Sequence, residues 1–134
     1  MWSDQYVGLA YADGGRTAAA VDCWGLVRLI FAERLGINLP AYDSSDDVAL
    51  QIKTAQATPE WTKFLEAKEF DIVTMLGPVK MKDKWHMIDR HVGVMATPKH
   101  VLHIDRNMTS TCLDLNHPLI RHRLSGFWRH RSML

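Results

Sequence analysis

The sequence is poor in cysteine: among its 134 residues only Cys23 and Cys112 carry a thiol. Two cysteines form no disulfide framework, and although they could pair, this count is more typical of free thiols from a reducing compartment. An excess of charge is also lacking, since 16 Lys and Arg stand against 15 Asp and Glu. This balance argues against a basic nucleic-acid-binding module, so we expect no nucleic-acid partner.

Long hydrophobic runs are absent as well. No apolar stretch approaches the roughly 20 residues needed to span a bilayer, so no membrane insertion is expected. Residues 1–5 lack the basic and then apolar pattern of a secretory signal peptide, which predicts synthesis in the cytoplasm without a cleaved leader. Repeats and low-complexity tracts are missing too, and the length suits one domain over residues 1–134.

The first half of the chain carries helical patterns. Apolar residues recur at spacings of three and four over residues 22–35, and Gly36 predicts the end of that helix. Residues 46–56 and 59–67 are also predicted to be helical, the second because it begins with a proline. The polar residues 43–47 are predicted to form a loop that ends in a helix N-cap.

The second half carries strand patterns. In chain order, the predicted strands cover residues 70–75, 91–96, 100–105, 111–115 and 119–124. Residues 77–90 are polar and rich in Lys and Met, and we expect a long loop or loose hairpin that forms a lid or an assembly contact. Helices followed by an antiparallel sheet predict an α+β fold.

Cys23 is the first candidate for chemistry, because it follows Asp22 at the predicted start of the first helix. Backbone N–H groups and the helix dipole stabilise a thiolate at such a position. The carboxylate of Asp22 opposes a second negative charge, so a further helper such as an imidazolium would be needed. Position alone favours the alternative, a small buried cysteine without reactivity, which is also what we expect of Cys112.

Two histidines favour a reactive Cys23 over a buried cysteine without reactivity. His91 and His103 are twelve residues apart and flank a predicted hairpin. If its loop has three residues, 97–99, then His103 faces Gly93 and His91 faces Asp105. Both imidazoles then project from one face of the sheet as diagonal neighbours, roughly 7 Å apart. A two-residue loop would place them on opposite faces.

A thiol at a helix start, an imidazole facing it and a second polar ring behind form a nucleophile, a base and an orienting group. The same residues, Cys23, His91 and His103, could also ligate zinc. They lack a fourth ligand and any typical metal-binding spacing, so we expect neither a metal nor a cofactor.

Four sequence blocks carry a family resemblance. In chain order they are residues 11–15 (YADGG), 22–27 (DCWGLV), 91–94 (HVGV) and 101–103 (VLH). Together they resemble the NlpC-type family of cell-wall cysteine peptidases over roughly residues 6–105. Their order and the twelve-residue histidine spacing make the resemblance specific. It implies a compact papain-like α+β fold, with the nucleophile at a helix N-terminus packed on an antiparallel sheet.

The resemblance also implies roles for single residues. Cys23 would be the nucleophile, His91 the general base and His103 the orienting third member. Tyr11 would line the substrate site, and Asp22 would help to hold the amino group of the substrate. The implied reaction is hydrolysis of the peptide stems of bacterial peptidoglycan, commonly between γ-D-glutamyl and a diamino acid, without a cofactor.

Trp24 departs from the pattern, because most cell-wall members of the family carry a serine after the cysteine. We expect this tryptophan to be one of the substrate-binding residues. Together with the motif at 35–40 (LGINLP), it resembles family members in phage tail-tip and tail-assembly proteins. The resemblance therefore predicts a phage or prophage protein that acts on the cell wall with tail-tip partners. Asp13 also departs, since the family often has Trp or Tyr there.

Two alternatives stay open at this point. The chain could be a non-catalytic tail-assembly or hub component that keeps the fold as a binding module. It could also be another thiol acyl-transfer enzyme on this fold, such as an amidase or an acyltransferase.

Overall fold

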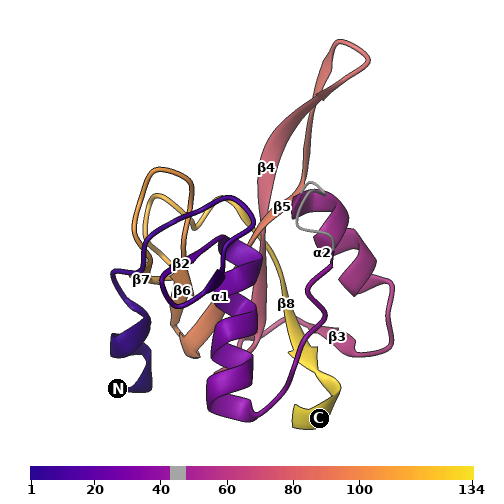
Figure 1. Cartoon of the computed structure of the whole chain (residues 1–134). Coiled ribbons are helices and arrows are strands. Elements are labelled where there is room, and N and C mark those ends of the chain that lie inside the picture. The colour runs from indigo at the N-terminus through magenta and orange to yellow at the C-terminus, as the bar shows by residue number, and fades with distance from the viewer. Residues whose placement is uncertain (43–47) are drawn as a thin grey trace.

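The fold centres on an antiparallel sheet covered by helix α1 (Cys23–Ile30), as Figure 1 shows for this computed structural model. The structure describes residues 1–42 and 48–134. The strands are β3 (Trp61–Phe64), β4 (Ile72–Met81), β5 (Lys84–Thr97), β6 (His100–His103), β7 (Thr111–Asp114) and β8 (Leu124–His130). Their order is β3-β8-β4-β5-β6-β7, and every neighbouring pair is antiparallel. The predicted α+β class is confirmed.

The segment before α1 is short and turn-rich. A 3-10 helix (Trp2–Tyr6) and a small hairpin, β1 (Arg16–Thr17) with β2 (Ala20–Val21), lie there. The Asp22 amide donates to the carbonyl of Gly15 at 3.2 Å, which holds the glycine turn against the start of α1. A side chain at Gly25 would collide with that same carbonyl oxygen, so both glycines serve the close approach of two backbones.

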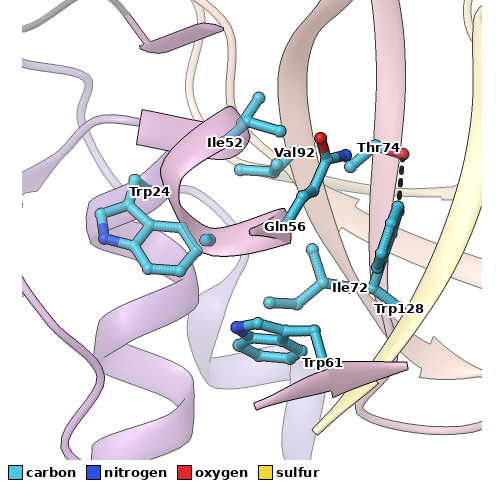
Figure 2. Close-up of a pocket in the computed structure, with 9 residues that line it drawn as sticks. Trp24, Ile52, Gln56, Trp61, Ile72, Thr74, Val92 and Trp128 are labelled. Atoms are coloured by element: carbon cyan, nitrogen blue, oxygen red, sulfur yellow. Dashed lines mark hydrogen bonds between the residues drawn. The ribbon is translucent and has the colours of Figure 1, made fainter. Parts of the chain in front are cut away.

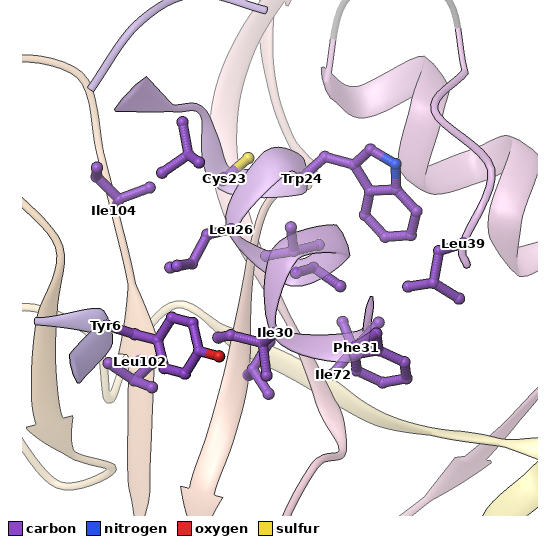
Figure 3. Close-up of a cluster of buried hydrophobic side chains, with 14 of the residues drawn as sticks. Tyr6, Cys23, Trp24, Leu26, Ile30, Phe31, Leu39, Ile72, Leu102 and Ile104 are labelled. Atoms are coloured by element: carbon purple, nitrogen blue, oxygen red, sulfur yellow. The ribbon is translucent and has the colours of Figure 1, made fainter. Parts of the chain in front are cut away.

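Helix α1 forms where the periodicity predicts it. It continues through a π-helical turn (Phe31–Leu35) and ends at Gly36, whose φ of 67° is left-handed. The face of α1 that carries Leu26 and Ile30 is fully buried against the sheet, in the cluster drawn in Figure 3. The helix prediction over 22–35 is confirmed, apart from the wider π-helical geometry of its last turn.

Of the next two predicted helices, the first is present in the structure and the second is not. Helix α2 (Val48–Gln56) agrees with the predicted 46–56, while the expected loop and N-cap at 43–47 fall outside the described residues. The predicted helix over 59–67 is wrong, because this segment contains the edge strand β3, which pairs with β8. A helix of nine residues is marginal by itself, so pairing with a neighbouring strand overrides the local signal of a proline.

Strands β4 and β5 extend well beyond the predicted 70–75 and 91–96. The segment 77–90, expected as a loop or loose hairpin, is a regular two-stranded arm that projects from the sheet at the end where α1 begins (Figure 1). Its turn residues Lys82 and Asp83 both have positive φ, 51° and 62°, the combination that a tight two-residue hairpin turn requires. Neither is glycine, so the sequence held little signal for this turn.

The hairpin of β5 and β6 corrects one expectation and confirms another. The loop has two residues, because Thr97 pairs with His100. A bulge between Met95 and Thr97 adds one residue to β5 and restores the expected register, so that Gly93 faces His103. The predicted loop length is therefore wrong, and the predicted register at the histidines is right.

The last predictions are split. Strand β7 confirms the predicted 111–115, and β6 is two residues shorter than the predicted 100–105. The predicted strand at 119–124 is wrong: this segment forms turns, in which the Ile120 amide donates to the carbonyl of His117 at 3.0 Å. Ile120 is fully buried in a second apolar cluster, which explains why the segment is apolar without being a strand. Among the described residues, no helix is both long and apolar enough to cross a membrane.

Candidate active site

Cys23 is the first residue of α1, as predicted. Asp22 is the N-cap of the helix, and its carboxylate accepts a hydrogen bond from the Gly25 amide at 2.6 Å. The guanidinium of Arg16, a residue for which no role was predicted, pairs with the same carboxylate. Cys23 itself is only 5% exposed, at the end of the buried cluster in Figure 3. The capping bond and the ion pair therefore fix the turn that carries the thiol.

His91 and His103 contact each other directly. The Nε2 of His91 and the Nδ1 of His103 lie 2.9 Å apart, and both imidazoles are buried. A Cβ at Gly93 would lie 2.8 Å from the Leu102 carbonyl and 3.2 Å from the Cβ of His103, so glycine there allows the close approach of β5 and β6 at the histidines. The structure thus joins the two predicted histidines into one hydrogen-bonded pair.

Asp105 completes this cluster, although no role for it was predicted. Its Oδ1 lies 3.4 Å from the Nδ1 of His91, and its Oδ2 lies 4.0 Å from the Nδ1 of His103. Arg123 approaches the same carboxylate, with 3.5 Å between its Nη1 and Oδ2. The predicted hairpin register already placed Asp105 opposite His91. A role could have been inferred from that register, because residues two apart in an extended chain share a face and Asp105 lies two residues after His103.

The thiol and the imidazoles are held in their neutral forms. Burial raises the pKa of the Cys23 thiol to about 12, with the carboxylates of Asp22 and Asp105 acting in the same direction. The backbone N–H groups of Val92 and Trp24 favour the thiolate and oppose this rise only in part. The expectation of a thiolate stabilised at the helix start is therefore reversed for the resting site.

Burial also changes the pKa values of the two histidines. It lowers the pKa of His91 to about 4, against the opposing effect of Asp105, and it lowers the pKa of His103. A neutral imidazole can accept a proton, so the arrangement is suited to general-base activation of a neutral thiol rather than to a preformed ion pair.

Tyr11 belongs to a polar cluster at the surface. Its hydroxyl donates to the Oδ1 of Asp13 at 2.9 Å, and Arg106 donates to the same oxygen at 2.9 Å. Burial raises the pKa of Tyr11 to about 12, with a smaller contribution from Asp13. Arg106 directly follows Asp105, the carboxylate that faces the histidine pair. Asp13, which departs from the family pattern, thus holds both Tyr11 and an arginine that sequence reasoning missed.

Trp24 points into the core. It is buried, and its indole N–H donates to the carbonyl of Pro40 at 2.9 Å. Figure 2 shows Trp24 beside a small cavity of about 20 Å³, with Trp61 and Trp128 on its other walls. A cavity of this size holds one water-sized group at most, and apolar walls keep such a space dry. The structure gives Trp24 a packing role, and its contact with substrate stays a prediction.

One group of side chains has the composition of a metal site. Candidate ligand atoms of His91, His103 and Asp105 lie within 4.8 Å of one another. The 2.9 Å hydrogen bond between the imidazoles already uses one nitrogen of each ring, so ligation through those atoms would require breaking it. The group fits acid–base chemistry better than metal binding.

Buried neutral histidines make stability depend on pH. The pKa of His91 is about 4 in the fold and about 6.5 in an unfolded chain, so between these values only the unfolded state binds the proton. Stability should therefore fall as the pH drops from about 6.5 towards 4, by up to about 3 kcal/mol for His91. Burial lowers the pKa of His103 and His130 too, which adds to this loss.

Chemical denaturation at pH 7.0, 5.5 and 4.5 measures this dependence. The His91→Gln variant should lose less stability between pH 7.0 and 4.5 than the wild-type protein. His86→Gln on the exposed arm is the matched control and should behave like wild type. An equal pH dependence in His91→Gln and the wild-type protein would contradict the assignment.

Comparison with known proteins points to one family and one fold. The model of the NlpC/P60 family matches residues 8–129, a span that contains all six predicted site residues. The chain is similar to the NlpC/p60 domain of the peptidoglycan hydrolase SagA, with a TM-score of 0.57 and 14% identity over 87% of this chain and 86% of that one. A search of curated proteins finds no match.

A second solved structure is similar as well. It is a protein of Staphylococcus aureus subsp. aureus Mu50 described as similar to lipoprotein, NLP/P60 family, with a TM-score of 0.60 and 23% identity. The alignment covers 94% of this chain and 38% of that one. At these identities the two structures establish the fold, and the predicted NlpC-type architecture is confirmed.

Proposed function

Because the chain belongs to the NlpC/P60 family, we propose that it is a cysteine peptidase that hydrolyses the peptide stems of bacterial peptidoglycan. The observation that supports this most is the buried pair of His91 and His103, joined by a 2.9 Å hydrogen bond, on the strand whose Val92 amide acts on the Cys23 thiol. Nucleophile, base and orienting group are thus drawn from α1, β5 and β6.

The proposed reaction begins with proton transfer from Cys23 to His91. The sulfur attacks the carbonyl carbon of the scissile amide, and the backbone N–H of Cys23 donates to the developing oxyanion. His91 then gives the proton to the leaving amine as the carbon–nitrogen bond breaks. A water molecule, deprotonated by His91, attacks the thioester that remains, and the thiol and a carboxylic acid are released.

The hydrogen bond between the histidines decides which nitrogen takes part. The Nε2 of His91 is hydrogen-bonded to His103, so Nδ1, which lies 3.4 Å from the Oδ1 of Asp105, is the nitrogen proposed to take the thiol proton. For this, Nε2 must carry the hydrogen and donate it to the Nδ1 of His103. His103 would therefore select the tautomer of His91 that can act as a base. This is the orienting role proposed for the third member of the catalytic group.

Two more specific proposals concern the bond that is cleaved and the biological setting of the protein. We propose cleavage between γ-D-glutamyl and a diamino acid, with Tyr11 and Asp22 at the substrate, because the motifs at 11–15 and 22–27 resemble the family there. Trp24 and the motif at 35–40 support a tail-associated protein of a phage or prophage that acts on the cell wall with tail-tip partners.

Mass analysis of digested peptidoglycan tests the function. We expect stem fragments that gain one water and expose a new amine on the diamino acid. Intact stems combined with rapid alkylation of Cys23 would favour the amidase or acyltransferase alternative. Intact stems together with an unreactive Cys23 would favour a binding module that has kept the fold.

A further inference from the structure

The carboxylate of Asp105 faces the nitrogen of His91 that is proposed to take the thiol proton. The Oδ1 of Asp105 lies 3.4 Å from that nitrogen, Nδ1, whereas Nε2 is engaged by His103. An anion at this distance from an imidazole attracts its protonated form more than its neutral form. The protonated form arises in the reaction only when Cys23 has released its proton.

The position of Asp105 is itself held from the far side. Arg123 lies 3.5 Å from the Oδ2 of Asp105, and its Nε donates to the carbonyl of Leu76 at 3.2 Å. The side chain of Asp105 is 37% exposed, and it contacts both His91 and Arg123. A fixed carboxylate therefore stands at the mouth of the site, beside the buried histidine pair.

Several charged groups act on this nitrogen together. Asp105 favours the imidazolium of His91, while burial, His103 and Arg123 oppose it. Asp105 also disfavours the Cys23 thiolate, but there it ranks behind burial and Asp22. Because Asp105 lies 3.4 Å from His91 and ranks directly after burial there, whereas it ranks lower at Cys23, its net effect should favour transfer of the proton from sulfur to nitrogen.

We propose that Asp105 is an acidic positioning residue of the site, which acts through His91 by stabilising the imidazolium formed when Cys23 loses its proton. The protein thus surrounds the reactive imidazole with two partners: His103 on Nε2 selects the tautomer, and Asp105 on Nδ1 stabilises the charge. This inference rests on the proposed pairing of thiol and imidazole, and it adds a carboxylate to the three residues that the family resemblance implies.

Alkylation of Cys23 by iodoacetamide between pH 3 and 9 tests the inference, with the modified residue identified by mass spectrometry. The range extends below the pKa of about 4 of His91, so that a shift of its acid limb to lower pH can be measured. In the plateau near neutral pH, the Asp105→Asn variant should react about tenfold more slowly, the effect of one pKa unit on the proton transfer. The acid limb, where His91 becomes protonated, should move to lower pH, because the carboxylate that raises the pKa of His91 is gone. Asp105→Glu restores the charge and should recover part of the rate and of the shift.

Asp114→Asn is the matched control, because Asp114 is an exposed carboxylate on β7, 3.9 Å from His100 and not part of the cluster. It should leave the rate and the acid limb unchanged. An unchanged or faster reaction in Asp105→Asn, or a slower one with an unmoved acid limb and no recovery in Asp105→Glu, would overturn the inference. The readout needs no peptidoglycan, so failure of the wild-type protein to cleave stems would count against the proposed function alone.

Discussion

Replacing Cys23 with alanine should abolish peptidoglycan hydrolysis, a loss of at least about a thousandfold, while the protein stays folded. The substitution removes one sulfur atom and keeps the Cβ, so the first turn of α1 and its Asp22 cap are preserved. His91→Ala should cause a comparable loss, because it removes the imidazole proposed to take the thiol proton. Release of soluble stem fragments from purified peptidoglycan, followed over time, measures both effects.

The control variants separate chemistry from folding. Cys112→Ala removes the other, half-buried thiol, and His100→Ala removes an exposed histidine of the same hairpin. Both should retain activity, whereas His103→Ala should weaken activity less than His91→Ala, since loss of an orienting group is partly tolerated. Full activity in Cys23→Ala or His91→Ala would refute the assignment of the nucleophile or the base.

Loss of the ion pair between Asp71 and Arg129 should have the largest effect on stability. The guanidinium donates twice to the carboxylate, at 2.8 Å and 2.7 Å, and Asp71 also accepts from the Lys68 amide at 2.8 Å. Both side chains are buried. Asp71→Ala leaves a buried guanidinium without its partner, which costs about 3–5 kcal/mol. For a domain of this size the melting temperature should fall by on the order of 10–20 °C.

Calorimetry of single and double variants checks this cost. Asp114→Ala, which removes an exposed carboxylate, should shift the melting temperature by only a few degrees. The double variant Asp71→Leu/Arg129→Met should be less destabilised than the sum of its single changes, because neither buried charge is left alone. Additive losses in that double variant would show that the pairing of the two charges does not determine the effect.

Local patterns were sufficient for much of the candidate site. The spacing of apolar residues predicts helix α1, and the residues around Cys23 predict its start, because capping and helical periodicity act over a few neighbouring residues. The register that unites His91 and His103 also follows from short-range geometry, although it is reached through a bulge and a shorter loop. Local patterns could not show that the pKa values of the thiol and the imidazoles are shifted in favour of their neutral forms, because burial is a property of the folded chain.

The remaining differences have one cause. Strand β3 exists because β8, more than sixty residues later, offers it a partner. Residues 119–123 form turns in which Ile120 is buried in the second cluster. The long arm depends on pairing along its whole length rather than on a recognisable turn. In the same way, Asp105 gains a role only when β5 and β6 bring it against His91.

What can be said of the two cysteines depends partly on the sequence and partly on the tertiary structure. By itself, the sequence determined that the two thiols form no disulfide framework and that Cys23 begins a helix, because both conclusions depend on composition and neighbouring residues. Only the tertiary structure decided that burial raises the pKa of this thiol and lowers the pKa of both histidines. Electrostatics and burial depend on groups brought together from distant parts of the chain, and no local pattern records them.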